Sequence, residues 1–142
     1  NDGLMMQTAI VEGIASADNP ALYRRAAAPL EQSLSAGAAR DVRQMMQATV
    51  RKGTARKLFR GAERDRVLAG LEIGGKTGSI DNRTHELRLD WFVGYAAERA
   101  GRSIAVAVLV AHEKFIGRRA ATYARMAIKE YFRPPEGPAS TS

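Results

Sequence analysis

The sequence predicts an α+β fold in which an antiparallel sheet is covered by helices on both faces. Three runs in the second half of the chain have strand character, and they cover residues 71–79, 89–98 and 103–112. Apolar residues at helical spacing flank these runs, over 35–53 and 120–131. The last strand-like run is apolar on both faces, which requires cover on both sides, and the predicted helices would supply it.

The N-terminal segment, residues 3–17, is predicted to form an amphipathic helix. Apolar residues recur at helical spacing between Met6 and Ala17. The Asp-Asn-Pro sequence at 18–20 would end this helix, because proline cannot continue one. Residues 20–34 contain two prolines and are predicted to be an irregular connection.

A second helix is predicted from Ser35, a suitable N-cap residue, to Gly53, which stands where a left-handed C-cap residue belongs. An apolar stripe runs along it from Ala38 to Val50. The basic stretch 55–70 that follows lacks a clear period, so we expect at most a short helical turn there.

The three strands are expected to belong to one antiparallel sheet. The Arg-Ala-Gly-Arg link at 99–102 is short enough for a hairpin, so the last two strands should be antiparallel. The polar segment 80–88 is either an ordinary hairpin loop or the rim or gate of a cleft. The C-terminal helix should end before Pro134. Residues 1–135 are then the folded part, and 136–142 a disordered tail.

Composition limits the classes of function. The 142 residues are 45% hydrophobic, which suits one moderate core rather than two domains. Cysteine is absent, so a disulfide framework, a thiolate metal site and a cysteine nucleophile are excluded. No apolar run approaches the roughly 20 residues that cross a bilayer.

The formal charge of +7 is concentrated in one segment. Residues 51–66 hold seven basic residues against two acidic ones. This segment is either a solvated face or a surface for anionic lipid headgroups, an acidic polymer or nucleic acid. Aromatic residues make up 6% of the chain and do not alternate with these basic residues, so no nucleic-acid partner is predicted.

The most informative sequence is Gly-Gly-Lys-Thr-Gly-Ser at 74–79. Lys76 supplies a compact positive charge, and the hydroxyls of Thr77 and Ser79 can donate hydrogen bonds to a carboxylate. Gly78 leaves the backbone uncovered, so a ligand can approach it closely. The pattern indicates an anion-binding strand of an active site.

These residues resemble the penicillin-binding protein family, which shares its fold with serine β-lactamases and β-lactam sensors. In that family Lys-Thr-Gly followed by Thr or Ser lies on a sheet edge, and the next strand often carries Trp-Phe-Val-Gly-Tyr, here residues 91–95. A helix ending in Gly-Thr-Ala, here residues 53–55, precedes the motif strand. The resemblance covers roughly residues 35–132. It implies the C-terminal portion of a penicillin-binding transpeptidase fold.

The resemblance implies a peptidoglycan D,D-transpeptidase that cross-links stem peptides through an acyl-serine intermediate. Lys76 would be the electrostatic anchor and proton-relay partner. Lys76, Thr77, Gly78 and Ser79 would bind the substrate, and the backbone amide of Ser79 would donate to the oxyanion. The resemblance implies neither a cofactor nor a metal.

The nucleophile of that family is missing from this sequence. It belongs to a Ser-x-x-Lys motif, and a Ser-x-Asn motif relays protons; no serine from Ser16 to Ser103 fits either pattern. We therefore expect an upstream portion of the same protein to carry both motifs, and this chain alone to be inactive. The alternative is a non-catalytic β-lactam or cell-wall sensor or scaffold of the same fold.

The resemblance also implies partners and a location. Peptidoglycan stem peptides and β-lactams would bind at the motif, in a protein that serves peptidoglycan synthesis and cell shape. A membrane anchor upstream of this chain would hold the protein at the periplasmic face of the cytoplasmic membrane, outside the cytoplasm.

Other residues carry weaker signals. His85 and His112 would need nearby carboxylates to hold a metal, and we interpret them as a surface-loop residue and a strand-end residue. Asp90 is expected to pair with an arginine or to cap its strand. Trp91 and Tyr95 either border the cleft or, as aromatic residues of a central strand, belong to the core.

Overall fold

The computed structural model describes residues 1–84, 86–113 and 115–134. The chain forms two compact units, Asn1–Val42 and Arg43–Ser142, and each is described by itself. The predicted disordered tail at 136–142 lies outside the described residues. No helix in the described ranges is long and apolar enough to cross a membrane.

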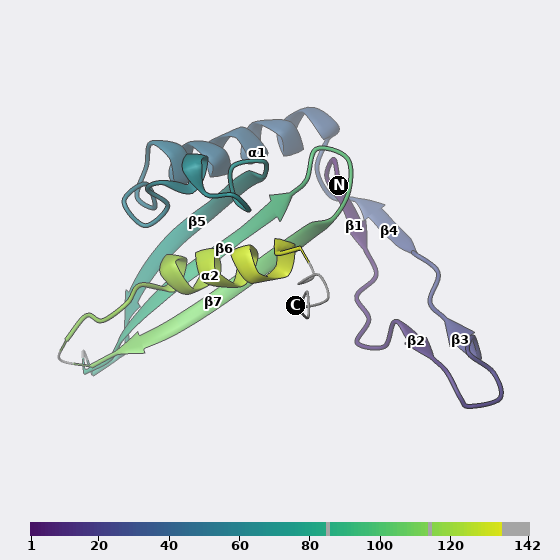
Figure 1. Ribbon diagram of the computed structural model, residues 1–142. Helices are drawn as coiled ribbons and strands as arrows, with labels where there is room; N and C mark the ends of the chain where they lie inside the picture. Colours follow the sequence, from purple (N-terminus) through teal and green to yellow (C-terminus); the bar gives the residue numbers. More distant parts are fainter. Residues whose placement is uncertain (85, 114, 135–142) are drawn as a thin grey trace, which may run out of the picture. The chain divides into compact units, whose positions relative to one another are not determined.

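The first unit contains two short antiparallel strand pairs (Figure 1). β1 (Leu4–Met6) pairs with β4 (Pro29–Gln32), and β2 (Gly13–Ile14) pairs with β3 (Tyr23–Arg24). The prediction of a helix over residues 3–17 is therefore wrong. The prediction of an irregular connection is also wrong where β3 and β4 form.

The helical stripe at the N-terminus fails because the described residues of the first unit give it no surface to cover. The side chain of Ile10 is fully exposed and that of Ile14 is half exposed. A helix there would gain little from packing, which supplies most of the stability of short helices. Hydrogen bonds between distant backbone segments hold this unit instead. One example is the amide of Gln7, which donates to the carbonyl of Ala28 at 2.9 Å.

Helix α1 (Ala36–Arg51) has the predicted start but a different end. The Ser35 Oγ accepts a hydrogen bond from the Ala38 amide at 3.2 Å, which confirms the N-cap. Gly53 does not adopt a positive φ, so the predicted left-handed C-cap is wrong. Glycine is needed there for space, because a Cβ would lie 2.8 Å from the Cα of Thr49.

The second unit is built on a three-stranded antiparallel sheet in the order β5-β6-β7. These strands are β5 (Glu72–Asp81), β6 (Arg88–Ala97) and β7 (Ser103–His112). The amide of Glu98 donates to the carbonyl of Arg102 at 2.9 Å and closes the β6–β7 connection. The predicted hairpin is confirmed.

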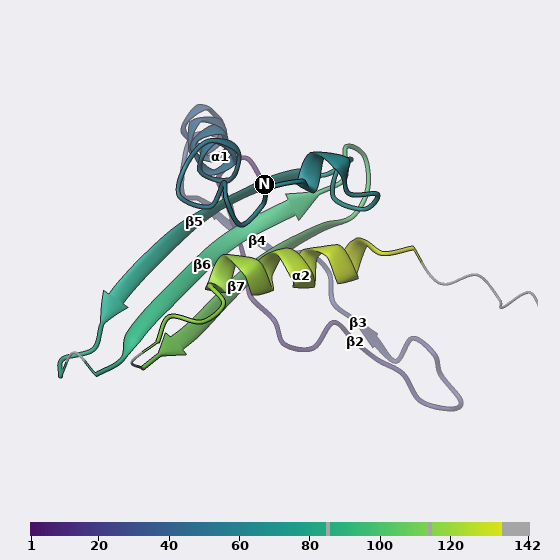
Figure 2. The ribbon, with the colours of Figure 1, turned by 60° about the vertical axis from the view of Figure 1, so that its left-hand side comes forward.

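Helix α2 (Ala120–Phe132) lies along β6 and β7 (Figure 2). It ends before Pro134, as predicted. Between α1 and β5 the chain forms turns and one short 3₁₀ helix, η1 (Ala62–Arg64), which agrees with the expected short helical turn.

The core lies on one face of this sheet. Phe92 and Ala96 of β6 are fully buried, and the buried Ile73 of β5 lies opposite Ala96 in the register. The other contributors come from α2, from the segment after α1 and from the end of α1, and they are Ala120, Ala121, Ala124, Ile128, Phe132, Ala55, Phe59, Leu68 and Val50. The helix and the connecting segment thus cover the same side of the strands.

The opposite face of the sheet is largely uncovered among the described residues. Side chains alternate along a strand, so Trp91 and Val93 of β6 point away from the core. Trp91 is 36% exposed, and Val93 and Leu109 are each 49% exposed. The expected cover of β7 by helices on both faces is not present in the described part of the chain, where α2 packs on one face.

Gly75 is required by the packing of this core, which makes a substitution informative. A Cβ at Gly75 would lie 2.2 Å from the Cζ of Phe92, whose ring is fully buried. We expect Gly75→Ala to lower the free energy of unfolding by about 1–3 kcal/mol, measured by urea titration. Gly78→Ala is the control, because its Cβ would lie 3.6 Å from the Cβ of Trp91, an ordinary contact. Equal losses from the two substitutions would contradict this account.

Asp65 ties the segment after α1 to α2. Its Oδ1 accepts from the amides of Val67 and Leu68 at 3.0 and 3.3 Å, and Lys129 Nζ donates to its Oδ2 at 2.6 Å. The hydrogen bond from Lys129, followed by the Val67 amide, lowers the pKa of Asp65 from 3.8 to about 2. The charged form of Asp65 is therefore favoured by folding.

This shift predicts how stability depends on pH. Because the pKa of Asp65 is lower in the folded state, its contribution is present above about pH 4 and is lost as the pH falls towards 2. We expect the difference in Tm between wild type and Asp65→Asn to be largest above about pH 4 and to shrink in acid. A Tm difference that stays constant from neutral pH to about pH 2 would rule this out.

Candidate active site

The Gly-Gly-Lys-Thr-Gly-Ser sequence lies within β5, the edge strand of the sheet in the described part of the chain. The carbonyl oxygen of Gly74 points towards β6, since a Cβ on Gly94 would lie 2.6 Å from it. Backbone groups alternate between the two sides of an antiparallel strand. Those of Thr77 and Ser79 consequently point to the open edge, where a ligand can reach them.

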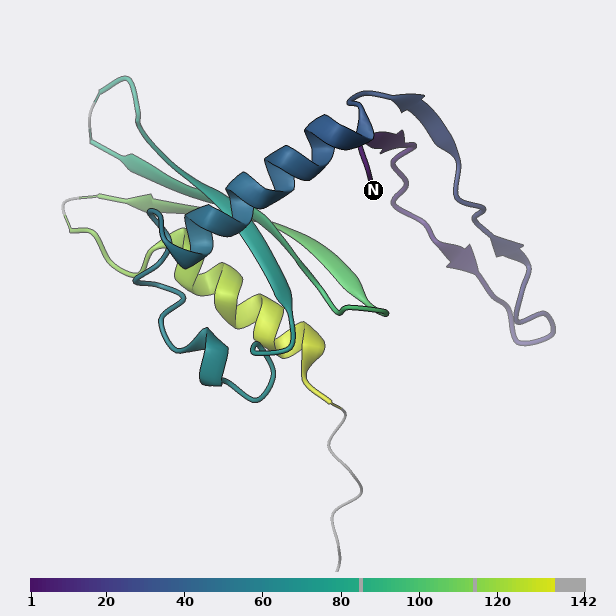
Figure 3. The ribbon, with the colours of Figure 1, turned by 90° about the horizontal axis from the view of Figure 1, so that it is seen from above.

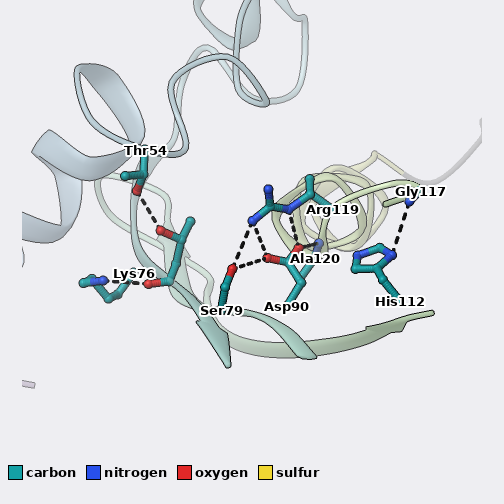
Figure 4. A network of polar contacts seen from close by, with 9 residues as sticks. Thr54, Lys76, Ser79, Asp90, His112, Gly117, Arg119 and Ala120 are labelled. Carbon is teal, nitrogen blue, oxygen red and sulfur yellow. Dashed lines mark hydrogen bonds and ion pairs between the residues drawn. The ribbon is translucent and has the colours of Figure 1, made fainter. Parts of the chain in front are cut away.

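Lys76 and Ser79 lie on opposite faces of β5. The Lys76 side chain is exposed, and its Nζ donates to the carbonyl of Thr77 at 2.6 Å. This contact crosses the open edge of the strand. In Figure 4 Lys76 points away from the group around Ser79. Because side chains alternate along a strand, the Lys76 ammonium lies on one face of β5 and the Ser79 hydroxyl on the other.

The Thr77 hydroxyl contacts the turn that follows α1. Its Oγ1 lies 2.7 Å from the Oγ1 of Thr54, within hydrogen-bond distance. The next residue, Ala55, is completely buried in the core. The Gly-Thr-Ala sequence thus docks the end of α1 onto the motif strand.

Ser79 belongs to a network centred on Asp90 (Figure 4). Arg119 binds the Asp90 carboxylate with Nη2 and Nε, at 2.6 and 2.9 Å. The amide of Ala120 donates to Oδ2 of Asp90 at 2.7 Å and begins α2. Ser79 Oγ lies 3.4 Å from Asp90 Oδ1 and 3.3 Å from Arg119 Nη2. The network joins the motif strand, the central strand and the helix.

Asp90 stays ionised although its side chain is only 4% exposed. Burial acts to raise its pKa, but the hydrogen bonds from Arg119 and from the Ala120 amide, with the charges of Arg119 and His112, outweigh it and leave the pKa lowered. The same pairing raises the pKa of Arg119. The expected arginine partner of Asp90 is thereby identified as Arg119.

Tyr95 forms a second polar group at the other end of β5. Its hydroxyl donates to Glu72 at 2.8 Å and accepts from Gln47 of α1 at 3.2 Å. Arg43 forms an ion pair with Glu72, and its guanidinium lies over the Tyr95 ring. Burial, then the interaction with Glu72, raises the pKa of Tyr95. Tyr95 is half buried in this group, and Trp91, on the same face of β6, is more exposed.

Of the two histidines, the structure describes His112. His112 ends β7 as predicted, but it is buried, and its Nδ1 accepts from the Gly117 amide at 3.3 Å. Its Nε2 is buried and has no hydrogen-bond partner among the described residues. His85 lies outside the described residues.

The arrangement can bind and polarise a substrate. Lys76 offers an exposed positive charge, and the open edge offers the amide of Ser79 to a developing negative charge. Sequence reasoning did not identify Thr54 or Arg119 as neighbours of the motif. The Gly-Thr-Ala sequence was the available signal for Thr54, whereas nothing near Arg119 in the sequence marks it as the partner of Asp90.

Comparisons with known proteins concern the family and the fold of the chain. The family described as "penicillin binding protein transpeptidase domain" matches residues 1–131. No match was found among curated proteins.

Two solved structures are similar to the chain. One is the D,D-transpeptidase domain of a peptidoglycan glycosyltransferase from Eggerthella lenta, with a TM-score of 0.63 and 24% identity, over 93% of this chain and 28% of that one. The other is penicillin-binding protein A from M. tuberculosis in an imipenem acyl-enzyme complex, with a TM-score of 0.66 and 23% identity, over 92% of this chain and 27% of that one. This chain thus spans little more than a quarter of either structure. At these identities the likeness concerns the fold, a mixed α+β arrangement with antiparallel sheets.

The Asp90 network predicts a specific loss of stability. Asp90→Asn removes the charge that Arg119 and the start of α2 share, and we expect the free energy of unfolding to fall by about 1–3 kcal/mol. Hydrogen exchange at the Ala120 amide should accelerate in the same variant. Glu130→Gln is the control, because its pairing with Arg133 is exposed, and it should change stability by less than about 0.5 kcal/mol. Similar losses in both variants would refute the role of the network.

Proposed function

The chain belongs to the penicillin-binding protein transpeptidase family, and we propose that it supplies the Lys-Thr-Gly wall of a serine D,D-transpeptidase active site. The reaction is the cross-linking of peptidoglycan stem peptides through an acyl-serine intermediate. The observation that carries the proposal is the placement of the motif on an open strand edge, with Lys76 exposed.

Each motif residue has a role in this proposal. Lys76 attracts the substrate carboxylate and takes part in proton relay, since its ammonium is exposed beside the strand edge. Thr77, Gly78 and Ser79 line the edge on which an extended substrate lies. The amide of Ser79 stabilises the oxyanion, and removing such a donor costs about 3 kcal/mol of transition-state stabilisation.

The nucleophile comes from an upstream portion of the same protein in this proposal. No Ser-x-x-Lys or Ser-x-Asn occurs from Ser16 to Ser103. The uncovered face of the sheet supports the proposal that an upstream portion packs on it. Three large apolar side chains, Trp91, Val93 and Leu109, are partly exposed there. Residues 1–135 then form the C-terminal part of one transpeptidase domain.

The remaining partners follow from this assignment. Stem peptides and β-lactams occupy the edge of β5, and the upstream portion anchors the protein in the cytoplasmic membrane with this domain on the periplasmic side. A sensor or scaffold of the same fold is the second candidate, because this chain lacks the nucleophile motif. The upstream sequence discriminates them: Ser-x-x-Lys followed by Ser-x-Asn favours the enzyme, and a multi-span membrane segment favours the sensor.

Acylation by a fluorescent penicillin tests the role of Lys76. In the intact protein we expect Lys76→Ala to slow acylation about 10²-fold, since it removes the charge that holds and polarises the substrate. Lys57→Ala removes an equally exposed lysine outside the motif and should leave the rate unchanged. An unchanged rate in Lys76→Ala would disprove the site assignment.

An experiment on the isolated 142 residues tests whether the attacking serine lies outside this chain. They should take up no covalent penicillin label, because the attacking serine lies elsewhere in the protein. A stable acyl adduct on this chain alone would overturn the proposal that it lacks the nucleophile.

A further inference from the structure

A cavity of about 650 Å³ lies where α1 ends and β5 begins, and none of the motif residues 74–79 lines it. Its walls come from the last turn of α1, from the segment after it and from the start of β5. Figure 3 shows this segment looping beside α2. Arg125 of α2 holds it there by donating to the carbonyls of Leu58 and Arg60 at 3.0 and 3.1 Å.

The floor of this cavity is apolar and its rim is basic. Val50, Phe59, Leu68 and Ile73 line it and are each less than 8% exposed. Three exposed arginines, Arg51, Arg56 and Arg60, also line it, with Glu63 as the single acidic lining residue. A concave site of this size with an apolar base and few charged groups has the character of a ligand pocket.

The three arginines have no ion-pair partner among the described residues. Some other arginines of this unit have one, such as Arg43 with Glu72, Arg102 with Glu98 and Arg119 with Asp90. Of the two acids in the same segment, Asp65 is occupied by Lys129, and Glu63 lines the cavity but forms no ion pair with these arginines in the described structure. Three unpaired guanidinium groups around one cavity favour an anionic occupant, and their planar forks suit carboxylates.

We propose that this cavity, the arginine pocket, binds an acidic segment of a partner polypeptide in which one large apolar side chain is flanked by carboxylates. The apolar side chain would fill the floor, and the carboxylates would meet Arg51, Arg56 and Arg60. Buried apolar anchors surrounded by polar contacts are the usual way in which a small pocket captures a protein segment. The inference extends beyond the proposed transpeptidase role and does not depend on it.

The shape of the pocket favours a peptide over a bilayer. Its apolar residues form the floor of a concavity, and a membrane surface is better matched by apolar side chains that protrude. A side chain projecting from an extended peptide can reach that floor while its neighbours remain at the arginine rim. Charge complementarity and concavity therefore point to the same occupant.

Selection from a random peptide library displayed on phage, with the intact protein as target, tests this proposal. We expect the enriched peptides to carry a large apolar residue with acidic residues within two positions of it. Their affinity is then measured by fluorescence anisotropy at physiological salt. The double variant Arg56→Glu, Arg60→Glu should weaken binding about tenfold or more.

A matched control uses the same segment and the same change of charge. Lys57 and Arg64 are exposed and do not line the pocket, so Lys57→Glu, Arg64→Glu should weaken binding less than about threefold once salt screens distant charges. Equal weakening in the two double variants, or enrichment of peptides without acidic residues, would overturn the proposal. So would capture by phosphatidylglycerol vesicles that depends on Arg56 and Arg60 and that the peptides do not displace.

Discussion

The packing of the second unit depends on the hydrogen bonds of one buried carboxylate, that of Asp90. One side chain holds the central strand, starts α2 through the Ala120 amide and fixes Arg119 beside Ser79. A charge in such a dry position is costly unless it is paired and hydrogen-bonded. Arg119 and the amide meet that requirement, so the ionised form persists and its pKa is lowered. Hydrogen bonds consequently tie the end of the motif strand to β6 and to the start of α2.

Successive side chains of the motif strand β5 point to opposite faces of the sheet. Thr77 and Ser79 direct their hydroxyls towards Thr54 and the Asp90 network, whereas Lys76 stays exposed on the other face. The backbone of Thr77 and Ser79 still points to the open edge. A substrate that pairs with this edge would meet main-chain groups first, which are held in place by the packing of Phe92 beneath Gly75.

Two surfaces of the second unit carry groups that have no partner among the described residues. The sheet face with Trp91, Val93 and Leu109 leaves apolar area in water, and the arginine pocket leaves three cations unpaired. Our proposal that an upstream portion of the protein completes the transpeptidase domain would account for the first, since a sheet normally buries the face that carries large apolar side chains. The second lies in the segment between α1 and β5, and the family assignment does not account for it.

The sequence by itself determined the three strands, the β6–β7 hairpin, the start of α1 at Ser35 and the identity of the motif, because these depend on local periodicity, turn residues and neighbouring side chains. It misled over residues 3–17, where helical spacing carries no weight without a surface to pack against. Only the tertiary structure decided that Arg119 pairs with Asp90 and that Thr54 meets Thr77, since the partners are 29 and 23 residues apart. It also decided which sheet face is covered. Such contacts depend on how elements pack in space, and no spacing along the chain encodes them.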